Sequence, residues 1–354
     1  MATITAELAA CQVHIEKDDY ISEENFYRLL DRIGKQLDQK RQKTPGAQYK
    51  HPCLAVFPEM IGAFLPIAGR ASLIRGASTT DLALTLIALR TLPKVARAML
   101  QHKSASLNVG FLLSVAPEVR RIYREAFSKF AKTHECWVVA GSALLPKNAH
   151  GELSERFEAQ EGRIYNTSYA FDPEGRAVGS TRKVNLVPTL EDTLGLSPGK
   201  AEEITPFETS FGRVATLICY DGFCIPHTKN EPRFTRLADR CDAQRCAIIA
   251  QPAANPWPWE EPWVFADTGE KQLRREQWCS EGLFSQLDYG SFQHLRYAVV
   301  PQLLGSVLDN RFDGRSQILE RHPSGRAHIA KEAEHAHAAP HAEDVVVHVV
   351  EWEL

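Results

Sequence analysis

The chain alternates between short apolar runs and longer stretches in which apolar residues recur every three or four positions. The first pattern is typical of buried strands, and the second is typical of helices that bury one face. Residues 7–15 and 53–57 predict strands, and Ser22 is suited to cap a helix between them. The stripe of this helix consists of Phe26, Leu29, Leu30, Ile33 and Leu37. A β–α–β unit of this kind favours sheets packed against helices.

The same patterns predict the remaining elements. A helix is expected to begin at Ser114 and Pro117 and to end near Thr133, and further helices are expected over residues 232–240 and 272–287. Strands are expected over residues 136–145, 163–171, 214–219, 246–251, 297–307, 312–319 and 344–352. The sequence shows neither an internal repeat nor a linker, so we expect a single domain over residues 1–354.

Residues 61–114 interrupt this regular order. Residues 82–89 are almost wholly apolar, with candidate N-caps at 79–81 and Pro93 as a stop signal. The run is much shorter than the roughly 20 residues that span a bilayer. We expect a buried helix pair or a subunit contact. An interfacial helix that docks on a membrane or carries an apolar substrate is the alternative, because basic residues surround the run.

Composition excludes several classes of protein. The chain has 354 residues, 44% hydrophobic and 24% charged, as expected for a globular protein. Its formal net charge of −3 predicts affinity neither for nucleic acid nor for anionic membranes. Eight cysteines without a regular spacing fit a reducing compartment, and the first residues lack the pattern of a signal peptide. We therefore expect a cytoplasmic protein with no transmembrane segment.

Three reactive side chains follow predicted strands or loops. Glu59 ends the run Leu-Ala-Val-Phe-Pro-Glu, Lys183 lies in a short segment that ends at Pro188, and Cys219 ends an apolar strand. A cysteine on an apolar strand is by default a small core residue. A thiol, a carboxylate and an ammonium group together, however, are the parts that acyl transfer requires.

These three stretches resemble the Glu, Lys and Cys motifs of the nitrilase superfamily, the carbon–nitrogen hydrolases. The order of the motifs and their strand contexts carry the resemblance, which covers most of the chain apart from the expanded segment 61–114. It implies an α/β fold, the four-layer α-β-β-α sandwich of the nitrilase type. It also implies a homodimer or larger homo-oligomer, and no cofactor.

The resemblance implies a role for each site residue. Cys219 is the nucleophile, Glu59 the base, and Lys183 the cation that stabilises the oxyanion together with the backbone N–H of Tyr220. A second carboxylate of the family site matches Glu191, although the neighbouring Asp192 leaves this assignment open.

The residues after the nucleophile bear on the reaction. True nitrilases tend to show Cys-Trp-Glu, whereas this chain has Cys-Tyr-Asp-Gly, which is more similar to the amidase and carbamoylase branches. The implied reaction is hydrolysis of a small-molecule amide or N-carbamoyl compound through a Cys thioester, releasing ammonia or an amine. A nitrilase, an acyltransferase and a catalytically silent scaffold on the same fold are the alternatives.

Asn255 and Trp257 are candidates for substrate binding. Asn255 follows a predicted strand in a Pro-rich loop, and Trp257 belongs to a Trp cluster with Trp259 and Trp263. Such a cluster either packs in the core or lines the mouth of the site, where it would suit an apolar or aromatic acyl group.

Histidines offer two rival interpretations. His227 lies eight residues after Cys219 and could act as a papain-like base, although a histidine in a polar loop is normally solvated. His335, His337 and His341 fall in an Ala- and Glu-rich run at residues 331–343, which has the composition of an exposed, mobile loop. We expect no physiological metal site there.

Overall fold

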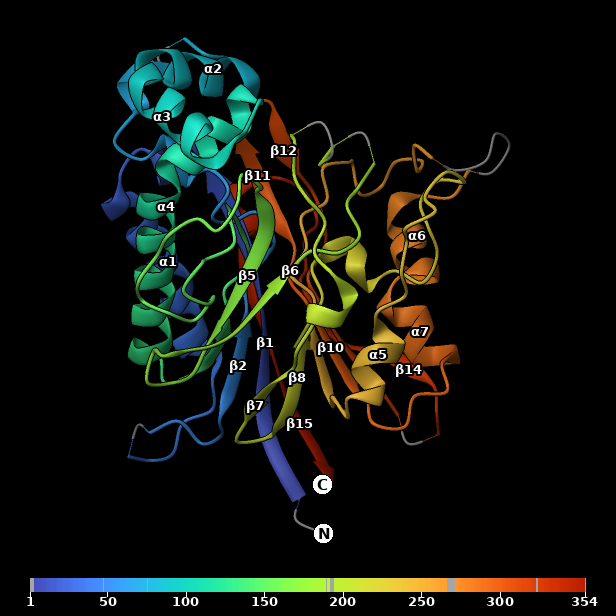
Figure 1. Ribbon diagram of the computed structural model, residues 1–354. Helices are drawn as coiled ribbons and strands as arrows, with labels where there is room; N and C mark the ends of the chain where they lie inside the picture. Colours follow the sequence, from blue (N-terminus) through green and yellow to red (C-terminus); the bar gives the residue numbers. More distant parts are fainter. Residues whose placement is uncertain are drawn as a thin grey trace.

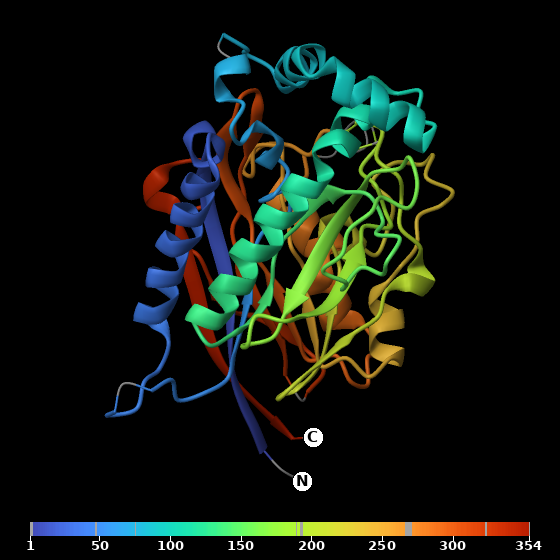
Figure 2. The same ribbon diagram turned by 60° about the vertical axis from the view of Figure 1, so that its left-hand side comes forward.

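The computed structural model describes residues 3–46, 48–74, 76–188, 190–191, 194–265, 271–322 and 324–353. Within these residues two β-sheets lie face to face, and helices cover the outer face of each sheet (Figure 1). Helices α1 and α4 lie on one side, and α5, α6 and α7 lie on the other (Figures 1 and 2).

The first sheet has nine strands built around the long strand β1. Its main path runs β12-β11-β1-β2-β3-β5-β4, while β15 also pairs with β1 and β6 with β5. Parallel pairing of β1 with β2, and of β2 with β3, confirms the predicted β–α–β order. The strands are β1 (Thr3–Glu16), β2 (Cys53–Val56), β3 (Trp137–Val139), β4 (Ala143–Leu145), β5 (Tyr165–Phe171), β6 (Ala177–Arg182), β11 (Leu303–Val307), β12 (Asn310–Phe312) and β15 (Asp344–Glu353).

The second sheet has six strands in the order β14-β13-β10-β9-β8-β7. Its centre is parallel, because β9 pairs in parallel with both β8 and β10. The strands are β7 (Phe207–Thr209), β8 (Gly212–Thr216), β9 (Ile248–Ala250), β10 (Tyr297–Val300), β13 (Gln317–Arg321) and β14 (Ala327–Glu332).

Three hydrophobic cores separate four layers. The first lies between α1, α4 and the nine-stranded sheet, where the rings of Phe57 and Phe127 meet edge to face at 4.9 Å. The second fills the space between the sheets and includes Val139 and Val214. The third, which includes Trp278, lies under the helices on the six-stranded sheet. The predicted α-β-β-α sandwich is confirmed. The helices are α1 (Glu23–Lys40), α2 (Thr80–Arg90), α3 (Leu92–His102), α4 (Leu107–Thr133), α5 (Ala238–Ala243), α6 (Arg274–Glu281) and α7 (Leu283–Tyr289).

Several predicted strands are divided in the structure. The run at 297–307 forms β10 and β11, which belong to different sheets, because Pro301 between them cannot donate to a ladder. The run at 136–145 forms β3 and β4, separated by Gly141 at φ +71. A Cβ at Gly141 would lie 2.1 Å from the carbonyl oxygen of Pro58. The run at 312–319 is likewise divided between β12 and β13.

The predicted helix boundaries are wrong in three places. Helix α4 begins after Ser106, whose hydroxyl accepts from Val109 N–H, so Pro117 lies inside the helix and not at its start. The helix expected at 232–240 is the short α5. The helix expected at 272–287 is interrupted at Gly282 and forms α6 and α7.

Segment 61–114 forms α2, α3 and the first turns of α4, which lie together at one end of the molecule beside β12 (Figure 1). Thr79 caps α2 as expected, but Pro93 lies in the first turn of α3 and does not end a helix. Ile87 and Val95 are buried, as a buried helix pair requires, whereas the subunit contact stays a prediction. Four leucines of α2 and α3 remain exposed: Leu82, Leu89, Leu92 and Leu100. In the described part of the chain no helix has the length and hydropathy needed to cross a membrane.

The His- and Ala-rich run at 331–343 is less exposed than its composition predicts. Ala333, Ala336 and Ala342 are buried. The Gln12 side chain of β1 donates to the carbonyl oxygens of His335 and Ala342 at 2.8 and 2.7 Å. The expectation of exposure is therefore wrong for these alanines, because a strand residue binds the backbone of the run.

Candidate active site

Cys219 lies in a tight turn just beyond a buried strand. Strand β8 ends at Thr216, and a 3-10 turn covers Cys219–Gly222. The backbone of Cys219 has φ +50, a left-handed conformation that a residue with a side chain rarely adopts. Two contacts support it: the Cys219 N–H donates to the Pro252 carbonyl at 2.7 Å, and Gln251 Nε2 donates to the Cys219 carbonyl at 2.7 Å. Strain that neighbours hold in place is a common feature of functional sites.

Lys183, Glu59 and Glu191 meet beside this turn. Lys183 follows β6, and Glu59 follows β2. The Lys183 ammonium lies 2.8 Å from Glu59 Oε1 and 2.6 Å from Glu191 Oε2. All three side chains are buried, with no more than 8% of any side chain exposed. The structure thus brings together Glu59, Lys183 and Glu191, which are far apart in the sequence. Asp192, the alternative to Glu191, lies outside the described residues.

The thiol of Cys219 belongs to the same cluster. The charges of Glu59, Lys183 and Glu191 all act on the buried sulfur, and the backbone N–H of Ala254 favours its thiolate form. Burial raises the pKa of the thiol, the negative charge of Glu59 raises it further, and Lys183 and Ala254 only partly oppose this shift. The resting thiol therefore keeps its proton, so nucleophilic attack requires a base.

The pKa of Glu59 is raised by burial first, while Lys183 opposes the shift and Glu191 adds to it. Burial disfavours the charge of Lys183, but Glu191 and Glu59 outweigh burial and hold its pKa well above the ordinary value. Lys183 is thus a permanent cation beside a carboxylate of raised basicity. This combination allows Glu59 to take a proton while Lys183 stabilises new negative charge.

Asn166 of β5 connects the two carboxylates. Its Nδ2 donates to Glu59 Oε1 at 2.8 Å and to Glu191 Oε1 at 3.0 Å. Its backbone carbonyl accepts from Lys183 N–H at 2.9 Å. Asn166 falls in the strand expected over residues 163–171, but its position in the sequence indicated no role in the site. The available signal was an amide on a strand that directly precedes the lysine segment.

Asp221 fastens the lysine segment to the cysteine turn. Its carboxylate accepts the backbone N–H groups of Val184, at 3.1 Å, and of Asn185, at 2.7 Å. The side chain is completely buried, and burial raises its pKa to about 7 despite these hydrogen bonds. In the sequence Asp221 stands out only as part of the Cys-Tyr-Asp-Gly stretch. Its contacts place it as a positioning residue for Lys183.

A cavity of about 230 Å³ opens beside Glu59, Lys183 and Glu191, whereas the buried Cys219 is not among the residues that line it. Glu59, Lys183 and Glu191 form its floor, and Ala254 and Phe312 contribute to its wall. Thr80 of α2 and Asn310 of β12 also line it, so segment 61–114 contributes to the mouth of the site.

Comparison with known proteins shows the family. The family model described as "Carbon-nitrogen hydrolase" matches residues 8–225. The chain belongs to the carbon–nitrogen hydrolase family.

Curated relatives match over limited stretches. This chain is 28% identical over 148 residues to Hydrolase C26A3.11 of Schizosaccharomyces pombe, covering 38% of each chain. It is 31% identical over 115 residues to human Omega-amidase NIT2, covering 29% of this chain and 37% of that protein. It is 32% identical over 107 residues to the 2-oxoglutaramate amidase of Bacillus subtilis, covering 30% and 36%. The chain thus spans less than half the length of these relatives.

Solved structures share the fold over nearly the whole chain. A carbon-nitrogen hydrolase from Helicobacter pylori G27 has a TM-score of 0.57 at 15% identity, covering 98% of this chain and 88% of that one. A mutant amidase from Nesterenkonia sp. AN1, with the acetamide moiety of fluoroacetamide added to its active-site cysteine, has a TM-score of 0.54 at 15% identity, covering 98% and 90%. At this identity the likeness establishes the fold alone.

The structure packs His227 against Tyr220 and Gln277. The His227 ring stacks on Tyr220 at 3.9 Å, and its Nδ1 lies 3.2 Å from Gln277 Nε2. Burial, helped by Arg274 and Lys183, lowers the pKa of His227 to about 2, so the ring stays neutral. The expectation of a solvated histidine is wrong, and these contacts give no support to a papain-like pair.

The Tyr220 backbone N–H directly follows Cys219 in the turn. The Cys219 N–H before it donates to Pro252, and the Asp221 N–H after it donates to Ile218 within the turn. The Tyr220 N–H lies between these two donors, directly next to the nucleophile. Its assignment as an oxyanion donor stays a prediction.

Asn255 organises the Pro-rich loop that follows β9. Its Nδ2 donates to the carbonyl oxygens of Trp257 and Asp313 at 2.6 and 2.9 Å, and its Oδ1 accepts from Arg274 Nε at 2.8 Å. The Arg274 guanidinium lies 4.9 Å from the Trp257 ring centre and 3.8 Å from that of Trp263. Neither Asn255 nor Trp257 lines the catalytic cavity, so their role in substrate binding stays a prediction without support from these contacts.

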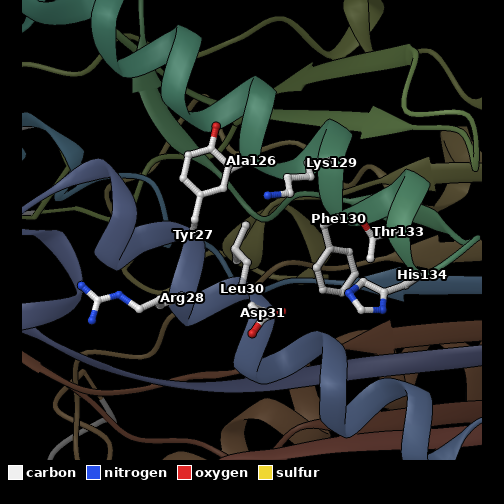
Figure 3. A pocket seen from close by; sticks show the side chains of 9 residues that line it. All are labelled: Tyr27, Arg28, Leu30, Asp31, Ala126, Lys129, Phe130, Thr133 and His134. Carbon is white, nitrogen blue, oxygen red and sulfur yellow. The ribbon is translucent and has the colours of Figure 1, made fainter.

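The other expected sites and hollows lie apart from the chemistry. The His335 and His341 rings meet at 5.2 Å, but no group of three or more potential metal ligands occurs among the residues that the structure describes. A separate hollow of about 260 Å³ lies between α1 and α4, with Tyr27, Lys129 and His134 around it (Figure 3). It contains no member of the catalytic cluster.

Proposed function

We propose that this chain hydrolyses the carbon–nitrogen bond of a small amide or N-carbamoyl compound through a thioester on Cys219. The observation that carries the proposal is the buried cluster in which Lys183 pairs with both Glu59 and Glu191, and in which the charges of all three act on the buried Cys219 thiol. These groups supply a nucleophile, a base and a fixed positive charge in one buried cluster.

The first half of the reaction forms the thioester. The sulfur attacks the carbonyl carbon while the thiol proton passes to Glu59, whose raised pKa suits it to receive the proton. The carbonyl oxygen becomes an oxyanion, which Lys183 and the Tyr220 N–H stabilise. When the oxyanion collapses, the C–N bond breaks, and the proton held by Glu59 passes to the nitrogen. Ammonia or an amine leaves, and Glu59 is again a carboxylate.

The second half releases the acid. Glu59 takes a proton from water as the water oxygen attacks the thioester carbon, and Lys183 again faces the oxyanion. The C–S bond then breaks, and the proton returns from Glu59 to the sulfur. Glu191 and Asn166 keep Lys183 and Glu59 in place through both halves, because each contacts the other members of the cluster.

The relatives favour an amide over a nitrile. Human Omega-amidase NIT2 and the Bacillus subtilis 2-oxoglutaramate amidase carry amidase activity in their names. In this chain the position after Tyr220 is Asp221, whose carboxylate is already bound to two backbone N–H groups. We therefore assign Asp221 the role of positioning the lysine segment. An amide or N-carbamoyl compound remains the proposed substrate class.

Ammonia release tests the proposal. Aliphatic and aromatic amides, N-carbamoyl compounds and nitriles are supplied without an added acceptor, which separates hydrolysis from acyl transfer. The panel compares the wild type with Cys219→Ala and with Cys224→Ala, which removes a nearby thiol of intermediate exposure. We expect release that is lost in Cys219→Ala and retained in Cys224→Ala. Release that survives in Cys219→Ala, or that occurs only with nitriles, would contradict the proposal.

A further inference from the structure

A second cavity, apolar in character, adjoins the catalytic cavity. It has a volume of about 60 Å³ and lies under α2, between this helix, α4 and the β11–β12 hairpin. The side chains that define it include Phe64, Ile67, Ala83, Leu84, Leu112 and Leu308. Most of these residues belong to segment 61–114, which is the part of the chain that departs most from the family pattern.

The two cavities share one wall. Met60, Thr80, Leu194 and Asn310 line both of them. Met60 directly follows the base Glu59, and its sulfur lies 3.9 Å from Asn166 Nδ2. A methionine side chain is unbranched and adapts its shape readily. Part of a substrate that enters the catalytic cavity can therefore reach the apolar cavity when the Met60 side chain moves aside.

Neither cavity offers a cation for a charged end of the substrate. Among the described residues that line them, the ionisable groups are Glu59, Lys183, Glu191 and Asp309. Lys183 is already paired with both glutamates, and Asp309 accepts from Thr80 N–H and Oγ1 at 2.8 and 2.9 Å. A carboxylate placed among these leucine and phenylalanine side chains would lose its hydration without gaining a cationic partner.

We propose that the apolar cavity receives the hydrocarbon end of the acyl group, so that the substrates are amides of unbranched apolar acids. This inference rests on the proposed function and names its substrate class. The reacting carbonyl lies over Cys219, and the acyl chain passes Met60 and ends against Leu112 and Ala83. Each buried methylene then strengthens binding about fourfold until the cavity is full.

A chain-length series tests the inference. The kcat/KM values of straight-chain amides from acetamide to hexanamide are compared with those of amides of similar length that end in a carboxylate. We expect kcat/KM to rise about threefold to fourfold per methylene and then level off. The carboxylate-ended amide is expected to fall at least tenfold below its uncharged counterpart. A flat series, or a preference for the charged amide, would overturn the inference.

Two leucines of α4 provide a matched pair of variants. Leu112 lines the apolar cavity, whereas Leu113, buried to a similar degree, does not. Leu112→Ala should move the preferred chain length up by one or two methylenes, and Leu113→Ala should leave it unchanged. Both substitutions remove the same atoms, so loss of stability alone would affect them alike. An unchanged preference in Leu112→Ala contradicts the inference.

Binding without turnover separates this inference from the proposed function. The same amides are titrated calorimetrically into Cys219→Ala, which cannot form the thioester. Affinity that rises with chain length, together with ammonia release by the wild type, supports both proposals. If affinity rises but no amide is hydrolysed, the proposed function fails and the apolar subsite stands. If amides are hydrolysed but affinity is independent of chain length, only the subsite fails.

Discussion

At the scale of single residues, the balance of charges around Lys183 governs where protons reside. One ammonium faces two carboxylates, Glu59 and Glu191, and the neutral thiol of Cys219 lies beside them. The cluster therefore carries one negative charge in excess while the thiol keeps its proton. An excess negative charge in a buried site raises the basicity of its carboxylates. Glu59 can then accept the thiol proton without a histidine.

Glu191→Gln should shift the pH dependence of the reaction. Glu59 acts as a base only when ionised, so kcat/KM falls as the pH drops through its raised pKa. Glu191 is one of the groups that raise this pKa, and its removal should move the acid limb of the kcat/KM profile down by about one pH unit. Glu152→Gln, which changes a partner of Arg182 outside the cluster, should leave the limb in place. A limb that stays fixed or moves upward in Glu191→Gln would refute the assignment.

Asp221→Asn should change the pH dependence of stability. The pKa of Asp221 is about 7 in the fold, against an ordinary value of 3.8, so the folded state favours the protonated form. The stability that Asp221 adds to the fold by holding its proton is fully present below pH 3.8. It is lost as the pH rises through 7. The span is at most about 4 kcal/mol.

The amide that replaces the Asp221 carboxyl does not titrate, so the variant lacks this loss. Urea unfolding at pH 5 and pH 8 should therefore show Asp221→Asn less stable than the wild type at pH 5, with a smaller deficit at pH 8. A deficit that grows with pH would mean that Asp221 is favoured as an anion in the fold.

The sequence predicted the charged residues of the site but not their connecting partners. Glu59, Lys183 and Cys219 stand out because each follows an apolar run or a loop near one. Asn166 and Asp221 act through hydrogen bonds to residues that are between 25 and 107 positions away in the chain. Because no periodicity encodes such pairs, only the fold reveals them.

At the scale of elements, the cysteine turn depends on the absence of a side chain at Gly222. A Cβ there would lie 2.2 Å from Gln251 Nε2, the atom that binds the Cys219 carbonyl. Gly222→Ala should therefore displace the turn and lower kcat about 100-fold, since a misplacement of about 1 Å has that effect. Gly179→Ala in β6 is the control, because its Cβ meets nothing closer than 3.5 Å. Steady-state kinetics that show equal rates for both variants would contradict this view of the turn.

Element boundaries were predicted best where polar and apolar positions alternate cleanly. The cap at Ser22 and its helix stripe are confirmed by α1. The apolar run at 297–307 predicts one strand, because its hydrophobicity continues through Pro301. In the structure β10 and β11 lie in different sheets. Pro117 was taken as a helix start, which is its commonest place, but α4 already begins at Leu107. Ser114 and Pro117 are local signals of a helix start. Packing of segment 61–114 against the end of the sheet outweighs both of them.

At the scale of the whole molecule, Gln12 connects both sheets to the run at 331–343. Its side chain donates to the carbonyl oxygens of His335 and Ala342 and accepts from Ser316 N–H at 2.8 Å. Gln12→Ala should lower the free energy of unfolding by roughly 3 kcal/mol, because buried partners lose their hydrogen bonds. Gln36→Ala removes one part-buried bond to Glu343 and should cost less than about 1 kcal/mol. Denaturant unfolding of both variants checks this, and equal losses would argue against it.

The sandwich followed from the sequence because its strands and helices each carry a clear pattern, and the family motifs fixed their arrangement. The apolar pattern of segment 61–114 predicted packed helices. It did not indicate that α2, through Thr80, also lines the catalytic cavity. That role depends on the contact of Thr80 with Asp309, which lies 229 positions away. The homo-oligomer and the cytoplasmic location stay predictions.

The most direct test of the account is the mass of the protein during turnover. Samples are quenched in acid while an amide is being consumed, and intact mass and peptide mapping then locate any adduct. We predict an adduct with the mass of the amide minus ammonia on Cys219, and a hydroxamate when hydroxylamine is present. An adduct on another residue would contradict the claim that Cys219 forms the thioester. So would ammonia release with unmodified protein and no hydroxamate.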